Sequence, residues 1–120
     1  MGNSYKKGDY DLRPWGKWEV LDSTDYFCVK RITINPHSML SLQLHHYRQE
    51  HWIFVEGKGV VTLDSDKFEM QTDNHVFIPK DMKHRIENTT DQPLCIIEIQ
   101  TGEKLDEKDI VRFEDIYGRC

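Results

Sequence analysis

Side chains with the chemistry of metal ligands occupy two short segments of this chain. Gln43, His45 and Glu50 stand in the first segment, and His84 stands in the second, beyond several turn-forming stretches. Amide oxygen, imidazole nitrogen and carboxylate are ligands that a divalent first-row metal accepts. We therefore expect one divalent cation to be held by Gln43, His45, Glu50 and His84, with zinc as the first choice and manganese, nickel or iron as alternatives.

An acidic residue inside an apolar strand suggests a second kind of chemistry, proton transfer. Glu98 stands between Ile97 and Ile99. A carboxyl group in such surroundings can have the raised pKa that a proton shuttle needs. The same residue could instead cap a structural arginine, and the sequence leaves both interpretations open.

The elements that position these residues are predicted to be strands, because the hydrophobic pattern has a period of two almost throughout. Many short strands separated by turn-forming residues, without helical patterns between them, indicate an all-β sandwich or barrel. A short helix or turn is expected only in the tail, residues 104–117, and residues 103–109 are expected to be a solvated charged turn. The predicted strands are 18–21, 26–34, 40–47, 52–56, 60–63, 67–70, 75–78, 84–88 and 94–101.

Strand parity decides which side chains share a face of segment 40–47. Gln43, His45 and Tyr47 project to one face, and three leucines project to the other. In an ordinary half-buried strand the leucines would face the core, but a barrel that holds a metal needs its polar ligands inside. We therefore expect the leucine face to lie outside, covered by a second subunit. The predicted homodimer contact is formed by Leu40, Leu42 and Leu44.

Length and composition limit the classes of protein that fit. The chain has 120 residues, 38% of them hydrophobic, which suits one domain. We expect a flexible N-terminus at residues 1–10 and a single domain at residues 11–120. The 16 basic residues are outnumbered by 21 acidic ones and form no basic block, so no nucleic-acid partner is expected. The sequence has neither an apolar leader segment nor a run near the roughly 20 apolar residues of a membrane span, which predicts a cytoplasmic protein without a membrane partner.

The two ligand segments resemble the two sequence patterns of the cupin superfamily. The second pattern has Asp81 where glycine is usual, and the first has Gln43 where histidine is more frequent. The resemblance implies an all-β cupin fold, a double-stranded β-helix or small jelly-roll barrel. The residues that match are Gln43, His45, Glu50 and Gly57 in the first pattern, and Pro79, His84 and Asn88 in the second.

Three longer stretches resemble the type II mannose-6-phosphate isomerase domain. They are Arg13-Pro14-Trp15-Gly16, residues 40–52 and residues 109–119. In that family this cupin usually follows a mannose-1-phosphate guanylyltransferase domain, and we expect the cupin to stand alone here. The resemblance implies a metal-dependent isomerase that interconverts mannose 6-phosphate and fructose 6-phosphate and feeds GDP-mannose and polysaccharide synthesis.

Such an isomerase moves a proton between C1 and C2 through an enediol, whose charge a divalent cation stabilises. Arg112 is our choice for stabilising the enediolate or gripping the phosphate, and Glu98 for the proton transfer. Arg48 and Lys30 are second candidates for the phosphate. Tyr47, where relatives commonly have histidine, is placed on the substrate side of the pocket. The alternatives are a non-catalytic cupin that binds a sugar or sugar nucleotide, and another sugar-modifying cupin enzyme.

Overall fold

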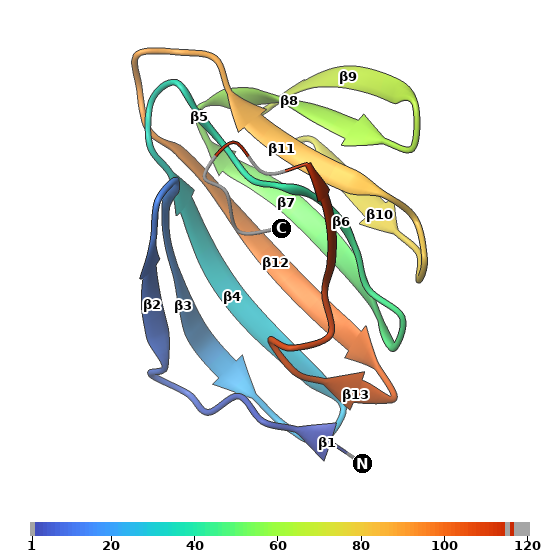
Figure 1. Ribbon diagram of the computed structural model, residues 1–120. Coiled ribbons are helices and arrows are strands. Elements are labelled where there is room, and N and C mark those ends of the chain that lie inside the picture. The colour runs from blue at the N-terminus through green and yellow to red at the C-terminus, as the bar shows by residue number, and fades with distance from the viewer. Residues whose placement is uncertain (1, 115, 117–120) are drawn as a thin grey trace.

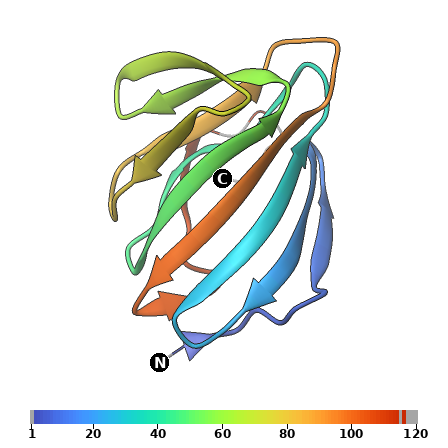
Figure 2. The same cartoon turned by 180° about the vertical axis from the view of Figure 1, so that it is seen from behind.

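Two six-stranded β-sheets packed face to face form the domain (Figure 1, and from behind in Figure 2). The computed structural model describes residues 2–114 and 116. The first sheet contains, in spatial order, β10 (His75–Ile78), β7 (Arg48–Glu56), β12 (Leu94–Gly102), β4 (Phe27–Ile34), β3 (Gly16–Ser23) and β2 (Tyr10–Arg13). The second contains β14 (Val111–Glu114), β6 (Leu42–Leu44), β11 (His84–Asn88), β8 (Lys58–Leu63) and β9 (Asp66–Gln71), with β5 (Ser38–Met39) paired to β11.

The predicted all-β fold is confirmed. Each of the nine predicted strands overlaps a strand of the structure, and the described residues contain no helix. It follows that no described helix is long and apolar enough to cross a membrane.

The interior of the barrel changes from polar at one end to apolar at the other, because the inward-facing residues of neighbouring strands change from polar to apolar in the same direction. On β7 the buried positions run from Arg48 and Glu50 to Trp52 and Phe54. On β12 the facing residues are Gln100 beside Glu50, Glu98 beside Trp52 and Ile96 beside Phe54. The apolar end is a closed core that includes Ile34, Phe54, Ile86 and Ile96, all fully buried. The buried polar side chains that could form a functional site therefore lie together at the other end of the barrel.

The predicted strand 40–47 is interrupted, and this overturns two expectations. β6 ends at Leu44 and β7 begins at Arg48, so the alternation of faces restarts at Arg48. Tyr47 consequently points outward with 47% of its surface exposed, so the expectation that it shares a face with Gln43 and His45 is wrong, and a contact of Tyr47 with the substrate stays a prediction. Leu40 precedes β6 and lines the interior cavity, so the three leucines do not share one outer face. Leu42 and Leu44 are half-buried outside, and a homodimer through them stays a prediction.

The first described residues of the chain pack on the domain, and the flexibility expected for residues 1–10 stays a prediction. β1 (Gly2–Asn3) pairs in parallel with β13 (Lys104–Leu105). Tyr5 is only 6% exposed and contacts the Trp18 ring edge-on, with ring centroids 6.0 Å apart. An aromatic anchor of this kind buries a large apolar area, which explains why the segment is held in place.

The tail is formed by strands and a turn, so of the short helix or turn expected there, residues 104–114 contain a turn and no helix. Residues 115 and 117 of the predicted range lie outside the described part. β14 pairs antiparallel with β6, placing Arg112 opposite Gln43 and Val111 opposite Leu44. The tail therefore runs beside β6, along the edge of the second sheet (Figure 1). The strand conformation of residues 111–114 is explained by their pairing with the backbone of β6, and local sequence preference does not explain it.

Candidate metal centre

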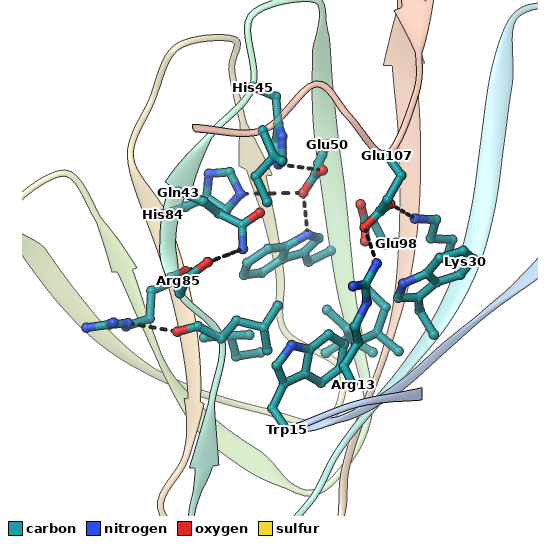
Figure 3. A pocket seen from close by; sticks show the side chains of 18 of the residues that line it. Arg13, Trp15, Lys30, Gln43, His45, Glu50, His84, Arg85, Glu98 and Glu107 are labelled. Atoms are coloured by element: carbon teal, nitrogen blue, oxygen red, sulfur yellow. Dashed lines mark hydrogen bonds and ion pairs between the residues drawn. The ribbon is translucent and has the colours of Figure 1, made fainter. Parts of the chain in front are cut away.

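Three of the four predicted ligands converge at the polar end of the barrel. His45, Glu50 and His84 offer ligand atoms that all lie within 4.8 Å of one another. Nε2 of His45 is 3.2 Å from Oε2 of Glu50, and Nε2 of His84 is 3.8 Å from Oε1. In Figure 3 dashed lines join the Glu50 carboxylate to both rings, and each of the three side chains is only 3% exposed.

Backbone carbonyl groups orient both imidazole rings. Nδ1 of His45 is 2.6 Å from the carbonyl oxygen of Asp109, and Nδ1 of His84 is 2.9 Å from that of Met82. With Nδ1 donating, each ring turns the lone pair of Nε2 toward Glu50, the arrangement typical of metal-binding histidine. Burial lowers the pKa of His84 to about 4, so this ring is neutral at pH 7 and can act as a ligand.

Two neighbours hold the carboxylate of Glu50. The Trp52 indole donates to Oε1 at 3.0 Å, and Nε of Arg48 donates to Oε2 at 3.0 Å. Burial alone would raise the pKa of Glu50, but its interactions with His45 and with the Arg48 guanidinium outweigh burial and hold that pKa well below the usual range. The site therefore contains an ionised carboxylate in a fixed orientation.

The fourth predicted ligand, Gln43, lies on the adjoining strand. Gln43 pairs with His84 across β6 and β11, is 9% exposed and lines the same cavity. Its amide nitrogen is turned to Ser41, 3.3 Å from the hydroxyl oxygen, which leaves the amide oxygen as the group available to a cation. Two imidazoles, a carboxylate and an amide oxygen fit a divalent first-row metal.

Two residues with positive φ explain positions in the cupin patterns. Asp81 has φ of 66°, a conformation that aspartate tolerates better than most residues and glycine better still. Its N–H donates to the carbonyl of His45 at 2.9 Å, so this turn also supports the ligand loop. Gly57 has φ of 82°, and a Cβ there would lie 2.6 Å from the carbonyl oxygen of Pro93.

Glu98 lies in the same cavity, one strand away from Glu50. It is 4% exposed, and the Gln100 amide donates to its carboxyl group at 2.9 Å. Burial first, and then the charge of Glu50, raise the pKa of Glu98 to about 8. The hydrogen bond from Gln100 and the raised pKa are compatible with the proton-shuttle interpretation, and the choice between that role and capping of an arginine stays open.

The cavity is rich in basic side chains although the whole chain has a formal net charge of −5. Lys30 is 2% exposed, lies 4.1 Å from the Tyr5 ring centroid and forms an ion pair with Glu107 at 3.0 Å. Arg48 donates hydrogen bonds to Glu50 and to the carbonyl of Asp106 at 2.9 Å, so it supports a candidate ligand, and its contact with a phosphate stays a prediction. Three carboxylates, Glu50, Glu98 and Glu107, and five basic residues, Arg13, Lys30, Arg48, Arg85 and Arg112, line the cavity.

Comparison with known proteins decides the family. The sequence profile described as "Mannose-6-phosphate isomerase C-terminal" matches residues 3–115. The chain belongs to this mannose-6-phosphate isomerase C-terminal family. It is 42% identical over 118 residues to a mannose-1-phosphate guanylyltransferase of Klebsiella pneumoniae, covering 98% of this chain and 25% of that protein. It is 49% identical over 107 residues to the alginate biosynthesis protein AlgA of Pseudomonas syringae pv. tomato, covering 89% and 22%.

The chain thus spans about a quarter of the length of these curated relatives. The cupin domain of Schizosaccharomyces pombe Cnp3 has the same fold, with a TM-score of 0.72 at 15% identity, covering 77% of this chain and 68% of that one. The cupin double-stranded β-helix is therefore confirmed for this isomerase-family domain.

Two residues of the isomerase-family site were missed by the sequence analysis. Glu107 and Asp109 fall in the stretch expected to be a solvated charged turn, but Glu107 bonds Tyr5, Lys30 and Arg13, and Asp109 is only 8% exposed. The charged residues of this short stretch follow no pattern that would have predicted the contacts of Glu107 or the burial of Asp109. The one available signal was the resemblance of the tail, since the matching stretch begins at Asp109.

The raised pKa of Glu98 predicts how pH affects the metal-free domain. Folding favours the protonated acid, because the pKa is about 8 in the folded protein and 4.5 without these surroundings. The contribution of protonated Glu98 to the free energy of unfolding is fully present below pH 4.5 and is lost as the pH rises through 8. Between pH 5 and 8 the chelator-treated wild type should lose roughly 2–4 kcal/mol of unfolding free energy relative to Glu98→Gln. Urea unfolding at several pH values measures this, with the outward-facing Glu56→Gln as control. Parallel curves for wild type and Glu98→Gln would contradict the prediction.

Proposed function

We propose that this domain is a metal-dependent isomerase that interconverts mannose 6-phosphate and fructose 6-phosphate. The observation that carries the proposal is one cavity in which a metal-binding triad, a carboxyl group of raised pKa and a surplus of basic side chains meet. A cavity more positive than the rest of the molecule favours an anionic substrate such as a sugar phosphate. Family membership makes the mannose and fructose phosphates the first pair to test.

Gln43, His45, Glu50 and His84 would hold the cation, and zinc is our first choice. A divalent cation there supplies Lewis acidity to the oxygen atoms of the sugar. Glu98 in its ionised form accepts the proton from C2 of the aldose and returns it to C1, while the hydroxyl proton passes from O2 to O1 as the carbonyl group moves from C1 to C2. Arg112, which lines the cavity from β14, stabilises negative charge on the sugar oxygens or on the phosphate.

The proposed setting is cytoplasmic supply of GDP-mannose for polysaccharide synthesis. The related AlgA and Klebsiella proteins are named for alginate biosynthesis and for mannose-1-phosphate guanylyltransferase. Cys28 and Cys95 are free and buried, as suits a reducing compartment. We propose a homodimer as the assembly state, to be tested by size-exclusion chromatography with light scattering.

Turnover of mannose 6-phosphate tests the proposal directly. Chelator-treated protein is expected to be inactive, and activity should return on adding zinc, manganese, nickel or iron(II), because the cation supplies the Lewis acidity that the proposed reaction needs. Fructose 6-phosphate formation can be coupled to NADPH production. His46→Ala is a matched control, since His46 is exposed and pairs with Asp81 outside the cavity. Sugar-phosphate binding without turnover under every metal would favour the non-catalytic sugar-binding cupin instead.

A further inference from the structure

The turn at residues 102–109, which we name the tail turn, lies against the ligand loop at residues 45–48. The N–H of Glu103 donates to the carbonyl of Tyr47 at 3.0 Å, and Arg48 donates to the carbonyl of Asp106 at 2.9 Å. Gly102 has φ of 148°, and a Cβ there would lie 2.3 Å from the carbonyl oxygen of Tyr47. Such close approach means that the two segments are packed backbone against backbone.

Asp109 makes the contacts that reach the ligand itself. Its carbonyl oxygen accepts from Nδ1 of His45 at 2.6 Å. Its carboxylate accepts from the backbone N–H groups of His46 at 2.9 Å and Tyr47 at 3.0 Å, one on each oxygen. One residue thus holds both the ring of His45 and the two backbone amides that follow it.

We propose that Asp109 is a positioning residue for the metal centre, which fixes the tautomer and direction of the His45 ring from the tail turn. This inference rests on the metal site of the proposed function. The carboxylate anchors the ligand loop to the tail turn, and that anchor keeps the Asp109 carbonyl aimed at Nδ1. Outer partners of ligating histidines typically affect metal affinity by 10–100-fold. Loss of the carboxylate should therefore weaken metal binding although Asp109 touches neither metal nor substrate.

Metal titration of Asp109→Ala tests the proposal, with Asp106→Ala as a matched control. The Asp106 carboxylate lies in the same turn but, within the part of the chain that the structure describes, accepts a hydrogen bond only from the N–H of Lys108, at 3.0 Å. In competition with a chromophoric chelator, Asp109→Ala should bind zinc and cobalt(II) 10–100-fold more weakly than wild type, and Asp106→Ala should match wild type within about twofold. The cobalt(II) absorption spectrum should also change in Asp109→Ala, because the ligand geometry changes. Equal affinities in the two variants overturn the proposal.

Two further measurements keep the test decisive. If Asp109→Ala does not fold, Asp109→Asn, which retains one acceptor oxygen, should bind at least threefold more weakly than Asp106→Ala, and equal binding overturns the proposal. If wild type binds no metal, the proposed function fails. The proposal for Asp109 is then tested by the tautomer of the His45 ring alone. Its nitrogen chemical shifts should show the Nδ1–H tautomer in wild type and a mixture in the Asp109 variant; an unchanged tautomer overturns the proposal.

Discussion

Replacing His84 with alanine is expected to abolish metal retention while the domain remains folded. His84 is 2% exposed, faces Glu50 and is neutral at pH 7 because burial lowers its pKa to about 4. Its removal therefore deletes a ligand without leaving an unpaired charge. The loss in affinity should exceed the roughly 10–100-fold that removal of an outer partner costs. Metal analysis of freshly purified protein, followed by zinc titration, measures it.

The matched control for this substitution is His46→Ala, which removes an exposed imidazole two residues beyond Leu44 and should leave metal content unchanged. Far-UV circular dichroism should show that both variants keep the strand content of the wild type. Full metal occupancy in His84→Ala would refute the site. Glu50→Ala is a poorer test, because it leaves Arg48 with a buried unpaired charge, a change that typically costs about 3–5 kcal/mol.

Glu98→Gln is expected to reduce turnover of mannose 6-phosphate by roughly 10²–10⁴-fold, the usual contribution of general acid–base catalysis. The amide fits the same space and can keep a polar contact with Gln100, but it cannot accept a proton from carbon. Metal content should be unchanged, which separates this variant from His84→Ala. In wild type, kcat/KM should rise with pH as Glu98 ionises, with an apparent pKa at or below 8, since a nearby cation favours the ionised form.

Kinetics of wild type, Glu98→Gln and the surface control Glu56→Gln at several pH values measure these effects. Glu56 lies at the end of β7 on the exposed face, so its substitution should leave the rate and its pH profile intact. Retention of more than about a tenth of wild-type turnover by Glu98→Gln would exclude Glu98 as the group that moves the proton.

The strands and the three candidate metal ligands that lie together could be predicted, because both depend on local sequence pattern. Alternation along a strand reports which side faces inward, and the spacing of His45, Glu50 and His84 matches a known pattern. The prediction failed for Tyr47 and Leu40 because the chain leaves strand geometry at both ends of β6, and parity cannot be carried across an irregular residue.

The tail was the least predictable part of the site. Val111–Glu114 is too short to show a clear period, and its conformation depends on pairing with β6. The contacts of Glu107 with Tyr5, Lys30 and Arg13 join segments far apart in sequence. No local propensity encodes such contacts, so these roles emerged only from the folded structure.

The parallel pairing of β1 with β13 brings together the first and last parts of the described chain. Arg13 and Arg112 likewise line one cavity although most of the domain separates them in sequence. Closing such long loops costs entropy, and β folds dominated by distant contacts reach the native state in milliseconds to seconds. We expect the cavity to take shape late in folding, once the tail has docked on β6. A cation taken up there should then stabilise the folded domain by mass action.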